Sequence, residues 1–443
     1  MSSESNEPKW FQQNFHSLEH SLNGLRESSF HQKRQSAYDR FSQLGFPTPK
    51  NEDWKYTNLR PVVAQVLERA TAESVKSVDA SLVENHAVPG LEAPRLCFVN
   101  GFFSKELSVT ELPKGCTFIS LSELLHDDTH PLRDQFEERF CSLSQGSDDA
   151  ISLFHNAFVE DGLILHIAKD ASLDKPIEAL FFGTSGPQGV VRYPRLFVIA
   201  EQGSKATLIE RYVSSGDSPS LTASYGEIFV EANASFTHYR FVMEQDRDSQ
   251  IARTAVHQER DSRFATTCFS FGGSMVRNEV TPVLDGPGCE TVLNGLSVLS
   301  GSQHVDNHTI IDHAHPNCES HELYKGIYAE RSEGVFCGTI IVRPDAQKTN
   351  AIQSNQGLLL DDTASLNSKP QLKIWADDVK CTHGATVGQL DQDALFYLRS
   401  RGISKNDAQK LLIQAFAGDV TKEVSIEALR DYAEAEVIAR LPQ

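Results

Sequence analysis

The sequence lacks several features that would assign a function at once. No apolar run approaches the roughly 20 residues that a helix needs to cross a bilayer. The first ten residues, MSSESNEPKW, hold no basic region followed by an apolar one, so we expect no signal peptide. No Walker sequence GxxxxGK[ST], no strand-borne GxGxxG and no HExxH occurs. These absences argue against a membrane protein, a secreted protein, an ATPase and a zinc protease.

Cysteine and positive charge are also scarce. Eight cysteines in 443 residues are far too few for a disulfide scaffold. Because no CxxC pair occurs, the usual zinc-ribbon and thioredoxin interpretations are removed, and we expect reduced cysteines in a cytoplasmic protein. The net charge of -19 argues against a nucleic-acid binder, which needs a basic face to neutralise phosphates. The acidic excess favours solubility or a basic partner.

The length predicts more than one core, and the N-terminal part, residues 1–150, is expected to be helical and mixed. Apolar residues at mostly helical spacings predict a first helix, on Trp10, Phe11, Phe15, Leu18 and Leu22. A second helix is expected at Gln32–Leu44, and short strands at Arg95–Val99 and Cys116–Ile119. The polar and aromatic segment Asn51–Thr57 suits either a partner surface or a capped turn in which Trp54 fills a local pocket.

The second region, residues 151–388, is predicted to be a β-solenoid. Short β-rich runs separated by Gly, Asn, Asp and Ser follow one another, with no convincing helical pattern for about 200 residues. A sandwich, a barrel and a solenoid are the alternatives, and a closed soluble barrel with this many strands is disfavoured. Strand pairs such as 197–213 and 228–244 recur at roughly 20–30 residues, as expected when each turn covers the apolar face of the last.

The third region, residues 389–443, is predicted to be a helical tail. Gln371–Ala376 alternates like a strand, and the period changes to that of a helix after Gly384. The expected helices are Gln392–Arg401, Lys405–Phe416 and Ser425–Arg440. Ser404 can cap the start of the second helix, and Gly418 is expected just past its end.

Five histidines between His304 and His321 suggest a metal site. His313, His315 and Glu319 form an HxHxxxE frame, which resembles part of the cupin metal motif, although Pro316 interrupts the strand that would carry it. One interpretation is a metal-dependent enzyme built on a β-helix. The other is that these histidines form hydrogen bonds in turns and ladders.

Cys381 and His383 are a second candidate site. Lying two residues apart, they would share one face of a strand. A thiolate and an imidazole suit iron, iron–sulfur clusters or zinc, but two ligands do not complete a site, so a partner or a distant segment would supply the rest. The alternatives are a cysteine protease pair and a buried cysteine beside a hydrogen-bonded histidine. A polysaccharide-acting enzyme using Asp377 and Asp378 is disfavoured, because adjacent strand residues face opposite sides.

Three long runs carry a resemblance to a known family. They are NEDWKYTNLRP at Asn51–Pro61, YKGIYAERSEGVFCGTIIVRPDAQKTNAIQSNQGLLL at Tyr324–Leu360, and ADDVKCTHGATVGQLDQDALFYLRSRGI at Ala376–Ile403. The chain resembles, over nearly its whole length, the SufD branch of the SufB/SufD family, the scaffold proteins of iron–sulfur cluster assembly. The absence of the HEAxxSK stretch and of CxxC cysteines, found in SufB or some SufB proteins, favours the SufD branch.

The resemblance implies a right-handed parallel β-helix flanked by N- and C-terminal helical domains. It implies a non-enzymatic subunit whose β-helix pairs with SufB and whose C-terminal domain docks the ATPase SufC. The family's ligand histidine lies in the KCxHGAT motif, which is Lys380–Thr386 here, so His383, with Cys381 beside it, would share a transient cluster or iron with a SufB cysteine. No cofactor is expected in the isolated chain, which could instead form a homodimer or a larger homo-oligomer that stores iron or clusters.

The predicted SufC surface lies on the tail. An apolar stripe flanked by aromatic residues and arginine is typical of an interface core. The residues are Leu395, Phe396, Tyr397, Arg401 and Phe416. The alternative is that these side chains only pack the tail onto the β-region.

Overall fold

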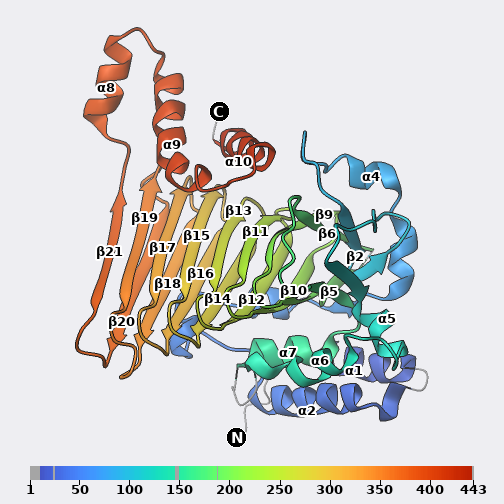
Figure 1. Cartoon of the computed structure of the whole chain (residues 1–443). Coiled ribbons are helices and arrows are strands. Elements are labelled where there is room, and N and C mark those ends of the chain that lie inside the picture. Colours follow the sequence, from blue (N-terminus) through green and yellow to red (C-terminus); the bar gives the residue numbers. More distant parts are fainter. Residues whose placement is uncertain (1–9, 23–24, 145–148, 187, 442–443) are drawn as a thin grey trace, which may run out of the picture.

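The chain is built on a parallel β-solenoid of about eight turns, and the computed structural model describes residues 10–22, 25–144, 149–186 and 188–441. From β8 to β21, successive strands alternate between two sheets (Figure 1). The first sheet has the order β20-β18-β16-β14-β12-β10-β8-β5-β4, with β7 also paired to β10 and β1 to β7. The second has the order β21-β19-β17-β15-β13-β11-β9-β6-β2-β3. The predicted mainly β fold with a parallel β-helix and flanking helices is confirmed.

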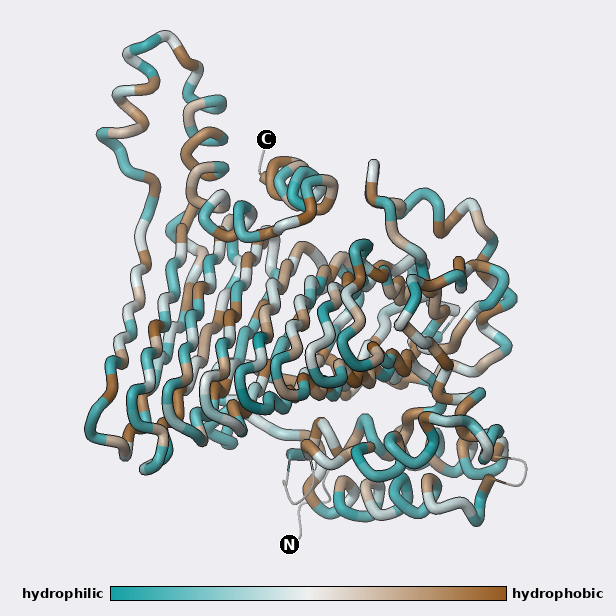
Figure 2. The backbone as a smooth tube through the Cα atoms, in the orientation of Figure 1, coloured by the Kyte–Doolittle hydropathy of each residue, from teal (hydrophilic) through white to brown (hydrophobic). Residues whose placement is uncertain are grey.

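The strands are short in the N-terminal part and mostly eight to eleven residues long in the solenoid. Their bounds are β1 Leu67–Arg69, β2 Arg95–Val99, β3 Phe102–Ser104, β4 Cys116–Ser120, β5 Gly162–Ile167, β6 Ile177–Thr184, β7 Gly189–Arg192, β8 Arg195–Ala200, β9 Lys205–Ser215, β10 Ser220–Val230, β11 Ser235–Met243, β12 Asp248–Gln258, β13 Arg263–Ser270, β14 Met275–Leu284, β15 Glu290–Leu299, β16 His304–His313, β17 Glu319–Tyr328, β18 Glu333–Val342, β19 Asn350–Leu359, β20 Ser365–Ile374 and β21 Lys380–Gly388. Along them hydrophilic and hydrophobic residues tend to alternate (Figure 2), as inward and outward positions require.

The helices lie before and after the solenoid strands. Their bounds are α1 Trp10–Ser21, α2 Ser29–Leu44, α3 Arg60–Val63, α4 Ala80–Glu84, α5 Leu121–His126, α6 Arg133–Arg139, α7 Ala150–Phe158, α8 Gln392–Ser400, α9 Lys405–Thr421 and α10 Glu427–Ala439. None of the helices in the described part of the chain is long and apolar enough to cross a membrane.

One corner of each solenoid turn repeats the same backbone conformation. The residue two positions before each strand from β9 to β19 of the second sheet has a positive φ between 57° and 75°. These residues are Gly203, Asn233, Asp261, Gly288, Asn317 and Lys348. Each donates its N–H to the next turn, as Asn317 does to the Gln347 carbonyl at 2.9 Å. Gly, Asn and Asp tolerate this conformation best. The feature that recurs from turn to turn is therefore the corner before the strand, and not a motif within the strand.

The N-terminal end of the solenoid is covered. β2 joins the second sheet through β6 and continues it with antiparallel β3, while β4 closes the first sheet antiparallel to β5. Helices α1, α2 and α7 pack on the outer face of the first sheet, where Phe15, Phe154 and Phe158 share one apolar cluster with Leu221 and Ile251. These contacts supply the capping that a terminal solenoid turn requires.

The C-terminal helices cover the outer face of the second sheet. α9 and α10 bury Ile413, Val420 and Leu429 in one apolar cluster with Phe241 and Leu296 of the strands. The α8–α9 hairpin projects away from the solenoid beyond this contact (Figure 1).

The C-terminal end of the solenoid is open in the part of the chain that the structure describes. β20 and β21 are the last strands of their sheets, and each pairs on one side only. Most of their residues are exposed or half-buried. Trp375, between the two strands, is 60% exposed. A solenoid that is covered at one end and open at the other presents two free sheet edges.

The structure changes several details of the prediction. β21 continues to Gly388, four residues past the point where the period appeared to change, and α8 begins at Gln392. Gly418 does not end the second tail helix, which continues to Thr421; the cap at Ser404 is confirmed by its bond from the Asp407 N–H. Helix α7 crosses the boundary expected at residue 150.

We predict that Asn317→Val destabilises the fold by roughly 1–2 kcal/mol, because a β-branched residue is strained at a positive φ. The Asn317 side chain is exposed, so the substitution removes little packing. The free energy of unfolding from denaturant titration measures the effect. Asn317→Gly is the control and should change stability by only a few tenths of a kcal/mol. Equal stability of the Val and Gly variants would contradict the role given to the corner.

Candidate ligand site at the open end of the solenoid

Cys381 and His383 lie on β21, the last strand of the second sheet. In the parallel register Cys381 is beside Ala351 and His383 is beside Gln353 of β19. Cys381 packs with Ile340 and Ala351 at the end of the solenoid interior, and burial raises the pKa of its thiol. His383 lies two residues further along the strand and therefore on the same, inward side. Its side chain is exposed because no further turn covers it among the described residues.

Behind His383, the interior is polar. Glu322 of β17 and Gln353 of β19 are adjacent in register, and both are buried, at 2% and 1% exposure. Gln353 Nε2 donates to Glu322 Oε2 at 2.6 Å. Burial raises the pKa of Glu322 to about 7, against the opposing effect of hydrogen bonds from Thr309 and Gln353. The exposed histidine thus stands at the end of a buried polar column.

The free edge of β21 keeps all of its backbone donors. Lys380 donates its N–H to the carbonyl of Thr349, the residue before β19, at 2.8 Å. The backbone N–H and C=O groups of successive residues alternate between the two sides of a strand. Those of Cys381, His383 and Ala385 therefore point toward the free edge. The β20 edge differs. Ser365 and Trp375 donate their N–H groups to the preceding turn, so the backbone groups of the even-numbered residues, including Pro370, face the free edge. Proline has no N–H, so the β20 edge is interrupted and the β21 edge is not.

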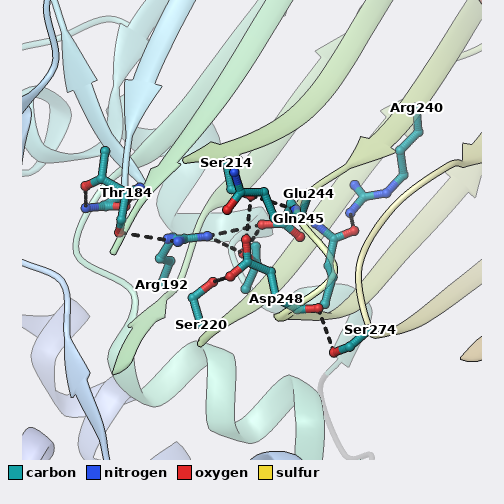
Figure 3. A network of polar contacts seen from close by, with 12 residues as sticks. Thr184, Arg192, Ser214, Ser220, Arg240, Glu244, Gln245, Asp248 and Ser274 are labelled. Carbon is teal, nitrogen blue, oxygen red and sulfur yellow. Dashed lines mark hydrogen bonds and ion pairs between the residues drawn. The ribbon is translucent and has the colours of Figure 1, made fainter. Parts of the chain in front are cut away.

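A second buried polar network lies in the first turns (Figure 3). Arg192 Nη1 lies 3.1 Å from Glu244 Oε1, and its Nη2 donates to the Thr184 carbonyl at 3.3 Å. Asp248 accepts hydrogen bonds from the hydroxyls of Ser214 and Ser220. Burial raises the pKa of Glu244 to about 7 even beside Arg192. This network ties β7, β10 and the β11–β12 turn together inside the covered end, far along the chain from His383.

The five histidines of 304–321 do not converge. His313 Nε2 lies 2.9 Å from Ser320 Oγ inside the solenoid, whereas His315 is partly exposed and 3.3 Å from Asp285. Glu319 and His321 are exposed on β17. Over residues 10–22, 25–144, 149–186 and 188–441, no group of three or more His, Cys, Asp or Glu side chains is arranged to hold a metal ion. The HxHxxxE frame is therefore not assembled, and these histidines form separate hydrogen bonds and ion pairs.

His304 and His308 are explained by the segment around Trp54. Trp54 is buried, with the Arg277 guanidinium 4.0 Å from its ring centre. Thr57 Oγ1 donates to Asp306 at 2.7 Å and lies 3.0 Å from His304 Nε2. His308 contacts the same Arg277. The Asn51–Thr57 segment is thus a turn held against the outer face of the first sheet, as the local-pocket interpretation predicts.

The five tail residues predicted for SufC docking separate into two sets. Leu395 is buried, and Phe416 packs under Lys325, whose Nζ lies 4.2 Å from the ring centre and donates to Asp419 at 2.7 Å. Those two residues hold the tail together and onto β17. Phe396 and Tyr397 are 74% and 58% exposed on α8. Arg401 lies 5.2 Å from the Tyr397 ring centre.

Sequence reasoning missed Glu322 and Gln353. Neither belongs to a motif, and they are separated from His383 by 61 and 30 residues, from their positions. One signal was present: the corner residues recur every 27 to 31 positions, from Gly203 to Lys348. Counting back one such interval from His383 reaches Gln353, and a second reaches Glu322.

Comparisons with known proteins place the chain among iron–sulfur assembly proteins. Residues 181–416 match the model of the SUF system FeS cluster assembly SufBD core domain, and residues 4–179 match the SufBD protein N-terminal region. The chain is 32% identical to an iron–sulfur cluster assembly SufBD family protein of Synechocystis, over 92% of this chain and 90% of the relative. It is 32% identical to the iron–sulfur cluster assembly protein SufD of Escherichia coli, over 90% of each chain, and 27% identical to SufD of Bacillus subtilis, over 63% and 64%.

We predict that Glu322→Gln removes a pH dependence of stability. The folded-state pKa of Glu322, about 7, is raised above its ordinary value of 4.5, so its contribution to stability is complete below pH 4.5 and is lost as the pH rises through 7. At pH 8 the variant should be more stable than wild type by up to roughly 3 kcal/mol, and at pH 5 the difference should be small. Denaturant titrations at both pH values measure this.

Glu319→Gln, which neutralises an exposed carboxylate on the same strand, is the matched control and should show no such gain. Parallel stability profiles for Glu322→Gln and wild type between pH 5 and pH 8 would contradict the prediction.

Proposed function

This chain belongs to the SufBD family of iron–sulfur cluster assembly proteins, and we propose that it is a SufD-type scaffold subunit of the SUF system. In this role the chain acts in the cytoplasm and catalyses no reaction of its own. It pairs with SufB, binds the ATPase SufC, and contributes ligands to iron or a nascent cluster held between the subunits. The observation that carries the proposal is the open end of the solenoid, where β21, a strand paired on one side only, bears His383 and Cys381.

The open end fits a β-solenoid partner. An uncovered strand with all its outward N–H and C=O groups is a template for another strand, which proteins ordinarily block. β21 is such a strand, and apolar side chains lie exposed on or next to the last turn, including Ile352, Trp375 and Val387. A second solenoid whose own end is open would continue the sheets and cover these groups. SufB is the partner proposed for this edge, and a second copy of this chain would occupy it when SufB is absent.

The ligand set on this chain is incomplete. Cys381 and His383 offer a sulfur and a nitrogen, the donor types that iron–sulfur clusters and iron accept. No third candidate ligand joins them among the residues described by the structure. Iron or a cluster is therefore proposed as cargo shared with SufB, which would supply the remaining ligands, and not as a resident cofactor of this chain.

The α8–α9 hairpin is the proposed site for SufC. It projects from the solenoid (Figure 1) and exposes Phe396 and Tyr397 beside Arg401, the residue types that dominate interface energetics. β21 leads into α8 through only residues 389–391. A movement of the hairpin would therefore be transmitted to the strand that carries His383.

We predict that Ala385→Pro weakens pairing with SufB on the order of tenfold, through loss of an outward backbone donor and distortion of the edge. The inward ladder to β19 is preserved, because Ala385 directs its N–H outward. Co-expression with SufB and SufC, followed by measurement of the subunit ratio after purification, tests this. Ala385→Val keeps the N–H and is the control. SufB recovered in full with the proline variant would exclude this edge as the pairing site.

We predict that Phe396→Asp lowers SufC binding by tenfold or more, since a charge placed at an interface core is costly to desolvate. Binding of purified SufC, measured by titration calorimetry, gives the dissociation constant. Val109→Asp, at an exposed apolar residue of the N-terminal part, is the control and should bind SufC as wild type does. If the two variants bound SufC equally well, α8 would not be the docking surface.

A further inference from the structure

Inside the open end of the solenoid, the buried polar column of Glu322 and Gln353 contains a hydrogen-bond acceptor that has no partner among the described residues. Glu322, Gln353 and His383 occupy the same register position on the last three strands of the second sheet. Gln353 donates its amide N–H to Glu322 at 2.6 Å. Its Oε1 is fully buried and has no hydrogen-bond partner among the described residues. Buried polar atoms are rarely left unpaired, so this oxygen needs an explanation.

The Gln353 amide is enclosed on two sides and faces β21 on a third. Glu322 accepts from Nε2, which fixes the nitrogen toward β17. Across the interior, Gly338 of β18 leaves the space that the amide fills, since a Cβ on that residue would lie 2.3 Å from Nε2. The third side is β21, about 4.8 Å away as neighbouring strands are. The side chain at this register on β21 is the imidazole of His383, directed to the same side as Cys381.

We infer that Gln353 is a positioning residue for His383: its Oε1 accepts the N–H of the imidazole, so that the other ring nitrogen carries no proton and faces the open end. A neutral imidazole has one donor and one acceptor nitrogen, and the bond made by the first decides which nitrogen is free to bind a metal. Such bonds to the outer nitrogen of a ligand histidine orient the ring and strengthen it as a ligand. Glu322 acts one step behind, by turning the Gln353 oxygen toward β21.

The inference rests on the proposed function only in assigning the free nitrogen to iron or a cluster. The inferred hydrogen bond would join two residues of this chain, which the structure places at the same register position. A partner covering the open end would exclude water from His383 and make the Gln353 oxygen the acceptor available to the ring.

The test is the tautomer of His383 in the full-length chain labelled with ¹⁵N-histidine, read from long-range ¹H–¹⁵N spectra. His383→Ala identifies the His383 signals. In wild type, one ring nitrogen should be protonated and the other bare, as a single dominant tautomer. Gln353→Met keeps the length of the side chain but removes the amide, and it should shift the tautomer populations several-fold toward those of free imidazole.

Two controls separate positioning from a general effect on the strand. Gln356→Met makes the same change on the outward face of β19 and should leave the His383 signals unchanged. Glu322→Gln keeps an acceptor for the Gln353 amide and should largely preserve the tautomer.

If Gln353→Met does not fold, Gly338→Ala displaces the amide instead and should produce the same shift. The buried Ser368 hydroxyl also lacks a partner; if it, and not His383, bonded Gln353, the His383 signals would not respond and the inference would be overturned.

Cluster assembly distinguishes this inference from the proposed function. In the complex co-expressed with SufB and SufC, His383→Ala should abolish most of the bound iron and sulfide, and Gln353→Met should lower them several-fold with subunit ratios unchanged. Normal assembly with His383→Ala would refute the ligand role but leave the tautomer result standing. Normal assembly with Gln353→Met, together with an unchanged tautomer, would refute the positioning role alone.

Discussion

The backbone ladder between solenoid turns is the constraint on which the rest of the structure depends. Each turn satisfies the N–H and C=O groups of the one before it, so the interior of the stack is complete but its two ends are not. At the N-terminal end, β2, β3 and β4 extend the two sheets past the solenoid turns, and the helices around α7 pack against the first sheet. At the other end β21 is left with an intact outer edge, while Pro370 interrupts the edge of β20. Of the two free edges at this end, that of β21 is therefore the uninterrupted one, and β21 carries the candidate ligands.

Parallel, in-register stacking also brings distant residues into columns. Because neighbouring turns align residue with residue, any inward polar side chain has a neighbour from one turn earlier. Many of these inward positions are apolar, and polar networks such as that of Arg192 and Glu244 join side chains from several strands. At the open end the column of Glu322 and Gln353 is not closed, and it ends beside His383. A ligand on the last turn can therefore be oriented from inside the fold, where solvent does not compete.

The sequence predicted the fold class because alternation and the absence of helical periodicity over about 200 residues are local properties. The sequence did not predict where each solenoid turn begins and ends. What recurs is the backbone conformation at one corner, and because Gly, Asn, Asp and Lys all occupy that corner, no single residue type marks it. The histidines of 304–321 show the same limit. Their clustering in sequence suggested shared ligands, but the alternation of strand positions and the turn at Pro316 send His313 inward and leave His315 partly exposed.

What the sequence determined by itself is the family, through long runs such as ADDVKCTHGATVGQLDQDALFYLRSRGI, and the pairing of Cys381 with His383 on one face, which follows from the period of a strand. The tertiary structure decided which strand is last, which edge is free, and which tail aromatics are exposed, since Phe416 is held under Lys325 while Phe396 is not. It also decided that Gln353 stands beside His383. The physical reason is that these are relations between turns about 30 residues apart, set by backbone hydrogen bonds whose register no local pattern records.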